Sequence, residues 1–109
     1  MSGRLVLVST PIGNLGDLSP RAAAELADAE YWLVEDSRVS AKLQAHLGIK
    51  RPMKVLNEHT PEARLQSYAS ELSAGAQAAL VTDGGAPGIS DPGALIVDMC
   101  RESGVRVAG

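Results

Sequence analysis

Short apolar runs recur along the chain and are separated by longer segments of mixed polarity. The runs occupy residues 5–8, 31–34, 53–56, 78–81 and 105–107, and the third and fifth contain a basic residue. A short continuous apolar run is typical of a strand that is buried on both faces, as in a parallel sheet. The pattern therefore predicts five strands, most of them buried.

The segments between these runs carry signals for helix formation. In three of them a capping residue precedes a proline at the first helical position: Ser19-Pro20, Thr60-Pro61 and Asp91-Pro92. Another helix is expected over residues 37–47, with Ser37 as its cap and Gly48 as its stop. Strands that alternate with helices predict an α/β fold, a three-layer sandwich with a mainly parallel five-stranded sheet.

Two of the loops that lead from a strand to a helix are rich in glycine and proline. They cover residues 10–17, after the first strand, and residues 82–93, after the fourth. Ligands of open parallel sheets bind beyond the carboxyl ends of the strands, and glycine lets the backbone approach a ligand closely. If both loops line one crevice, the first and fourth strands must be adjacent, because neighbouring strands lie only ~4.8 Å apart. The alternative is that these glycines only form tight turns.

Composition excludes several classes of protein. Ten basic against thirteen acidic residues give a net charge of −3, and aromatic residues make up 3%, so an autonomous nucleic-acid-binding domain is not expected. The single cysteine, Cys100, cannot form an internal disulfide and fits a reducing, cytoplasmic compartment. No apolar run approaches the ~20 residues of a membrane helix. One cysteine and two distant histidines give no metal-ligand cluster.

The best-known nucleotide-binding motifs do not match. The first loop has Gly13 and Gly16 three positions apart, which is the wrong spacing for a dinucleotide fingerprint, although Glu35 and Asp36 follow the second strand as acids do in that motif. Two interpretations of residues 35–38 remain open. Asp36 or Ser37 caps the next helix while Arg38 pairs with an acid, or the carboxylates and the guanidinium line the rim of a crevice.

Three segments, residues 9–17, 35–38 and 81–93, together resemble the tetrapyrrole methylase family, and within it the ribosomal RNA small subunit methyltransferase I branch. The resemblance implies methyl transfer from S-adenosylmethionine to a cytidine ribose 2′-hydroxyl in small-subunit ribosomal RNA. It also implies a homodimeric parent with two α/β domains, of which residues 1–109 would be the N-terminal one. This chain would then be a fragment, inactive by itself.

Two other functions stay open. The parent could methylate a tetrapyrrole, that is a porphyrin or corrin, although the first loop lacks the extra glycines of those enzymes. The chain could also be a nucleotide-binding or dimerisation module without catalysis.

The resemblance also implies roles for particular residues. The expected cofactor contacts are Leu15, Gly84, Gly85, Ala86 and Ile89. The expected contacts on the substrate side are Asn14, Asp17 and Arg38. Asp36 or Glu35 is the candidate general base, because a ribose hydroxyl is a weak nucleophile that a nearby carboxylate can assist.

Overall fold

The computed structural model of the chain describes residues 3–11, 13–83 and 91–109. Over these residues strands alternate with helices, as the sequence predicts. In chain order the elements are β1 (Arg4–Thr10), the 3-10 helix η1 (Leu15–Asp17), α1 (Pro20–Asp28), β2 (Tyr31–Val34), α2 (Ser37–Leu47), β3 (Met53–Val55), α3 (Glu62–Ser73), β4 (Gln77–Asp83), α4 (Asp91–Glu102) and β5 (Arg106–Ala108).

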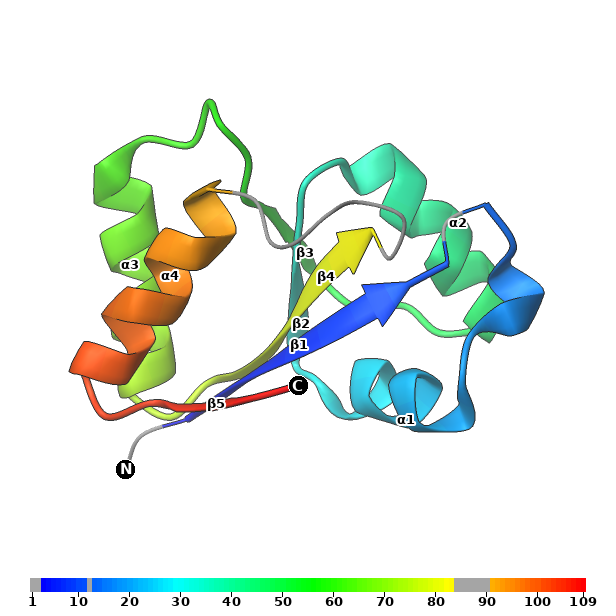
Figure 1. The fold of residues 1–109 in the computed structure, drawn as a ribbon, viewed down its shortest axis with the longest axis horizontal. Helices are drawn as coiled ribbons and strands as arrows, with labels where there is room; N and C mark the ends of the chain where they lie inside the picture. Colours follow the sequence, from blue (N-terminus) through cyan, green and yellow to red (C-terminus); the bar gives the residue numbers. More distant parts are fainter. Residues whose placement is uncertain (1–2, 12, 84–90) are drawn as a thin grey trace.

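The strands form one parallel sheet in the order β3-β2-β4-β1-β5 (Figure 1). β1 lies between β4 and β5, and its register with β4 pairs Leu7 with Leu80 and Thr10 with Asp83. The predicted adjacency of the first and fourth strands is confirmed. The two glycine-rich loops therefore start from neighbouring positions at the carboxyl edge of the sheet.

Helices cover both faces of this sheet. α1 and α2 lie on one face, and α3 and α4 lie on the other (Figure 1). Each face has its own core, in which Leu26 and Trp32 pack on the side of α1 and α2, and Leu33 and Leu72 on the side of α3 and α4. Every residue of β2 is buried, as expected of a strand that is covered on both sides. The predicted three-layer α/β sandwich is confirmed.

The starts of the first two α-helices follow from local capping. The Ser19 hydroxyl accepts a hydrogen bond of 3.1 Å from the N–H of Ala22, which caps α1. The cap of α2 is Asp36, one residue before the predicted Ser37, because an Asp36 carboxylate oxygen accepts from the N–H of Arg38 at 2.9 Å. Asp36 lies two residues after the end of the buried strand β2, so the cap fixes the path of the chain from β2 into α2.

The predicted Thr60 cap of the third helix is wrong. α3 begins at Glu62 after Pro61, and no side chain caps it. The Thr60 hydroxyl oxygen accepts a hydrogen bond of 2.9 Å from the N–H of Asn57, and the Thr60 N–H donates to the Asn57 carbonyl at 3.0 Å. Thr60 therefore closes the turn after β3, because Asn57 offers it a partner that the sequence pattern does not reveal.

A substitution at Gly3 should destabilise the fold. A Cβ atom at this position would lie 1.7 Å from the Ala76 carbonyl oxygen, and the Gly3 N–H donates to the Leu72 carbonyl at 2.6 Å. Overpacking of this kind costs about 1–3 kcal/mol, so Gly3→Ala should lower the free energy of unfolding in urea by that amount. Gly13→Ala is the matched control, because its Cβ would meet nothing within 4 Å. Equal stability of the two variants would contradict this account.

Candidate active site at the carboxyl edge of the sheet

The β1–β4 pair is tied together at the point where the two glycine-rich loops begin. The Thr10 side chain is 1% exposed, and its hydroxyl donates to the Thr82 carbonyl at 3.0 Å. The Thr82 hydroxyl in turn donates to the Val8 carbonyl at 3.4 Å. These two bonds cross between the strands in opposite directions. They hold the last residues of both strands in fixed register, which gives the loops a rigid base.

The first loop is organised by Asn14. Its side-chain oxygen accepts from the Gly16 N–H at 3.2 Å, and its amide group donates to the Asp17 carboxylate at 3.2 Å. The Asn14 side chain caps η1, and both Asn14 and Asp17 remain exposed at the rim. Leu15 is half-buried, and its side chain lines a cavity at the carboxyl edge of the sheet. The loop therefore presents two polar groups outward and one apolar group inward.

The segment after β2 confirms the first interpretation of residues 35–38, in which Asp36 caps α2 and Arg38 pairs with an acid. The second interpretation, in which these side chains line the rim of a crevice, stays a prediction. Asp36 caps α2 and also pairs with the guanidinium of Arg38, with two N–O distances of 3.3 Å. The hydrogen bonds from the Arg38 side chain and backbone hold the pKa of the Asp36 carboxyl below its usual range, and the same pair raises the pKa of Arg38. The Arg38 side chain is 90% exposed. A carboxylate so occupied is a poor proton acceptor.

The Glu35 carboxylate, unlike that of Asp36, is unpaired among the described residues. The residue is exposed, and among the described residues its carboxylate has no hydrogen-bond or ion-pair partner. Its backbone carbonyl accepts from the amide group of Asn57 at 3.4 Å, and the Asn57 side-chain oxygen accepts from the His59 N–H at 2.9 Å. Asn57 thus joins the loop after β3 to the loop after β2. Asn57 was not predicted from the sequence, where its place just after the apolar run of residues 53–56 is the available signal.

The cavity beside Leu15 has a volume of ≈ 170 Å³. Its lining residues come from β1, η1, α2 and β4: Thr10, Leu15, Val39, Ser40, Lys42, Leu43 and Val81. Sites for drug-sized ligands occupy roughly 300–1,000 Å³, so this cavity has room for only part of a nucleoside-sized cofactor. Four of the five expected cofactor contacts, Gly84, Gly85, Ala86 and Ile89, lie outside the described residues.

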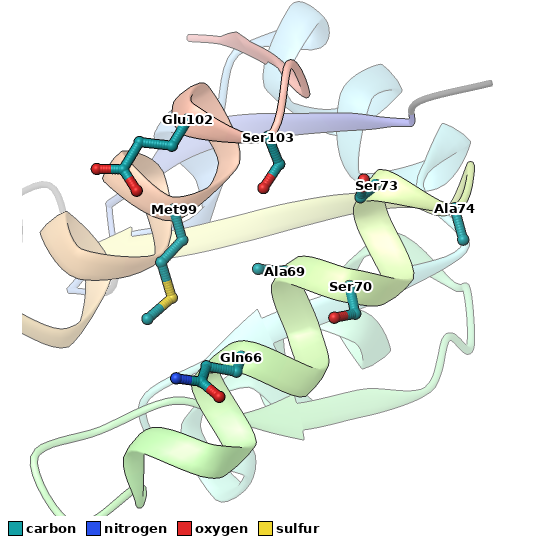
Figure 2. Close-up of a pocket in the computed structure, with 8 residues that line it drawn as sticks. All are labelled: Gln66, Ala69, Ser70, Ser73, Ala74, Met99, Glu102 and Ser103. Carbon is teal, nitrogen blue, oxygen red and sulfur yellow. The ribbon is translucent and has the colours of Figure 1, made fainter.

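Two larger hollows lie away from the carboxyl edge of the sheet, one beside α4 and one beside β3. One, of ≈ 630 Å³, is a groove between α3 and α4, where Met99 points toward α3 and the Glu102 carboxylate points away (Figure 2). The other, of ≈ 730 Å³, lies between β3 and α3. There Lys54 pairs with Glu71 at 2.7 Å and stacks on the Tyr31 ring, and burial raises the pKa of Tyr31. Neither hollow combines a free polar group with an enclosed space.

The structure also bears on membranes and metals. Within residues 3–11, 13–83 and 91–109, no helix is long and apolar enough to cross a membrane. In the same part of the chain, no three His, Cys, Asp or Glu side chains gather closely enough to hold a metal ion.

The Asp36–Arg38 pair predicts a pH dependence of stability. The folded-state pKa of Asp36 is lowered, so its contribution to stability is present above the ordinary aspartate pKa of ~3.9 and is lost as the pH falls through the folded value. Asp36→Asn keeps a capping side chain but removes the charge. Its free energy of unfolding should therefore fall less steeply than that of the wild type below about pH 4. Parallel curves in urea titrations at several pH values would contradict this origin of the shift.

The parallel sheet with helices on both faces places this chain among the α/β proteins, which bind ligands beyond the carboxyl ends of their strands, where both glycine-rich loops begin. The chain belongs to one family of that class, the tetrapyrrole (corrin/porphyrin) methylases, whose sequence profile matches residues 4–108. The resemblance seen in the three sequence segments is thereby confirmed.

Curated relatives of this chain share one name within the family. Ribosomal RNA small subunit methyltransferase I from Xylella fastidiosa is 46% identical over 105 residues, which are 96% of this chain and 38% of the relative. The protein of that name from Haemophilus influenzae is 41% identical over 107 residues, which are 98% of this chain and 38% of the relative. The chain thus spans less than two fifths of the length of these relatives.

A solved structure supports the fold. The crystal structure of uroporphyrin-III-C-methyltransferase from Thermus thermophilus matches 99% of this chain and 46% of its own chain, with a TM-score of 0.68. Sequence identity is 23%, so this likeness concerns the fold alone.

Proposed function

We propose that the chain is the N-terminal α/β domain of a two-domain, S-adenosylmethionine-dependent methyltransferase. The parent would methylate a cytidine ribose 2′-hydroxyl in small-subunit ribosomal RNA, in the cytoplasm and as a homodimer. The observation that carries the proposal is the set of relatives named ribosomal RNA small subunit methyltransferase I, which are 39–47% identical over nearly the whole chain. The net charge of −3 suggests that other parts of the parent supply much of the RNA-binding surface.

The residues of the carboxyl edge fit a cofactor of this kind. An enclosed, largely apolar cavity lies next to the rigid β1–β4 pair, and Leu15 lines it. We assign cofactor contacts to Leu15 and, in the second loop, to Gly84, Gly85, Ala86 and Ile89, where a glycine-rich backbone would allow close approach. When bound, S-adenosylmethionine supplies an electrophilic methyl group on a sulfonium.

This chain would bind and orient the substrate on the outer side of the edge. Asn14 and Asp17 are exposed after the end of β1, and Arg38 is exposed after the end of β2, where its guanidinium is suited to a phosphate of the RNA backbone. Most of the acceleration would come from alignment of the acceptor oxygen with the methyl carbon. A ribose hydroxyl that accepts a methyl group gives up its proton, so a base at this edge would have to take that proton.

The structure favours Glu35 over Asp36 for that base. Both Asp36 oxygens already accept hydrogen bonds from Arg38, and the lowered pKa of Asp36 makes it a weaker proton acceptor. Glu35, the first residue after β2, is exposed and has no such partner among the described residues. We therefore assign Asp36 a structural role in capping α2 and holding Arg38, and Glu35 the proton transfer.

A chimeric enzyme tests the proposal. Residues 3–109 of this chain would replace the matching segment of the Haemophilus influenzae relative. The chimera should methylate small ribosomal subunits that lack the modification, and mapping of the product should place the methyl group on a cytidine ribose. Ser70→Ala, on the exposed face of α3, is the control that should leave activity unchanged. A folded chimera without activity on these subunits would overturn the proposal.

A tetrapyrrole substrate is the second candidate, because the family profile carries that name. It predicts methylation of uroporphyrinogen by the chimera, which an absorbance change on mixing with the cofactor would report. A third candidate, a module without catalysis, predicts cofactor binding or dimerisation by the chimera but no methyl transfer to either substrate.

A further inference from the structure

The first residue of β1 is an arginine that starts an otherwise apolar strand face. Successive side chains of a strand point to opposite faces of the sheet, so Arg4 shares a face with Val6 and Val8. Val6 and Val8 belong to the core beneath α1 and α2. The Arg4 side chain therefore extends from the amino end of β1 along the face that α1 and α2 cover, where its hydrocarbon stem can pack on apolar groups.

One nitrogen of this side chain is buried without a hydrogen-bond partner. Among the described residues nothing bonds to Arg4 Nε, and no ion pair joins the Arg4 guanidinium to a described carboxylate. An unpaired donor that belongs to a cation is especially costly to bury. Buried polar atoms are almost always hydrogen-bonded, so this exception indicates a partner from outside the chain.

A small cavity adjoins Arg4 at the amino edge of the sheet, at the opposite end from the glycine-rich loops. Its volume is ≈ 30 Å³. The lining residues come from β1, β4, α1 and the residue after α1: Arg4, Val6, Glu25, Asp28, Ala29, Gln77 and Ala78. A water molecule needs roughly 10–15 Å³ and about two to four polar partners, so the cavity has room for one or two waters and for no larger ligand.

The charges around the cavity decide what can occupy it. Glu25 and Asp28 each bring a carboxylate, which disfavours an anion, and the Arg4 guanidinium disfavours a cation. A water molecule has no net charge and can accept from Arg4 Nε–H while it donates to a carboxylate. Glu25 is the more suitable acceptor, because its side chain is 19% exposed, whereas Asp28 is an exposed residue. Only one Glu25 oxygen has a partner among the described residues, Arg21 Nε at 3.4 Å.

We propose that this cavity binds one ordered water molecule, which accepts a hydrogen bond from Arg4 Nε and donates one to the Glu25 carboxylate. The water completes an ion pair between the first residue of β1 and α1, and so holds the helix on the sheet. Gln77 closes the cavity from β4, where its backbone N–H donates to the Glu30 carboxylate at 2.9 Å. The site lies away from the carboxyl edge and does not depend on the proposed function.

NMR spectra of the chain with isotope-labelled arginine test the proposal. The Arg4 Nε–H proton should show a cross peak to the water signal, with the sign of dipolar transfer from a long-lived bound water. The Arg38 side chain is the internal control, because it is 90% exposed and its peak should have the sign of proton exchange with bulk water. An exchange peak at Arg4 would mean that Nε is open to solvent. No peak would mean a dry cavity or a direct ion pair, and either result overturns the proposal.

Substitutions identify the acceptor. Glu25→Met keeps most of the side-chain length but removes the carboxylate, so the bound-water peak of Arg4 should disappear. Exchange of the Nε–H proton with solvent should become about tenfold faster, the effect of one lost hydrogen bond to a charged group. Asp28→Ala is the matched control, because it removes the neighbouring carboxylate, and there the peak should persist. If Asp28→Ala removes the peak and Glu25→Met does not, the proposal is wrong.

A variant that fills the cavity tests the place of the water. Ala29 lines the cavity and is 6% exposed, so Ala29→Val should put methyl groups where the water lies and remove the bound-water peak. The indole N–H signal of Trp32, which donates to the Leu26 carbonyl in the same core, shows whether this variant is folded. A bound-water peak that survives in folded Ala29→Val would contradict the proposal.

Discussion

Trp32→Ala should lower the free energy of unfolding by about 3–5 kcal/mol, the loss expected for a large aromatic side chain removed from a core. Trp32 is 0% exposed in β2 and packs in the core beneath α1 and α2. Its indole N–H donates to the Leu26 carbonyl at 3.0 Å, so the ring also binds the end of α1. Alanine would leave both a cavity and an unpaired buried carbonyl. Urea unfolding followed by circular dichroism measures the loss.

Trp32→Phe is the matched control. It keeps a ring in the core but removes the donor to Leu26, so its loss of stability should be clearly smaller than that of alanine. Equal losses in the two variants would mean that the hydrogen bond, rather than packing, dominates. A loss below 1 kcal/mol in the alanine variant would contradict the place of Trp32 at the centre of this core.

Most of the fold could be predicted from local patterns. The apolar runs marked the strands, and Gly48 and Gly104 stopped their helices with φ angles of 69° and 78°, which only glycine adopts easily. The adjacency of β1 and β4 followed from the requirement that two loops share one crevice, and the sheet confirms it. These features depend on short sequence segments or on simple geometry. The resemblance of the loops to a known family pointed to the same edge.

The capping residues were harder to predict because several residues compete for one backbone group. The pattern Thr60-Pro61 looks like a helix start, yet Thr60 bonds to Asn57, which lies three residues earlier. A sequence pattern gives the candidates for a hydrogen bond but not which of them is in reach. The same limit applied to Asp36 and Ser37, both of which could cap α2.

The cavity and the different states of the two carboxylates could not be predicted at all. Ser40 is one of several polar residues on α2, and only the packing of η1 against that helix makes it the wall of an enclosed space. Glu35 and Asp36 are adjacent acids with the same formal charge. Their difference arises from the position of the Arg38 side chain, which binds one and not the other.

Because Asp36 is paired with Arg38 and Glu35 is not, the largest effect on activity is expected from a substitution of Glu35. In the chimeric enzyme, Glu35→Gln should lower kcat by about 10²–10⁴-fold, the usual contribution of a general base. Glutamine keeps the size of the side chain but cannot accept the proton of the ribose hydroxyl. Glu35 is exposed, so the free energy of unfolding should stay close to that of the wild type. Single-turnover methyl transfer to small ribosomal subunits measures the rate of the chemical step.

Asp36→Asn is the matched control, because it changes the neighbouring acid in the same way. Asparagine still caps α2, while its pairing with Arg38 weakens, so substrate binding should suffer more than the chemical step. The expected result is a raised KM with a nearly unchanged kcat. If Asp36→Asn instead lowers kcat more than Glu35→Gln does, the roles of the two carboxylates are reversed. In that case the Asp36–Arg38 pair must open when the substrate binds, because only an Asp36 released from Arg38 could take the proton.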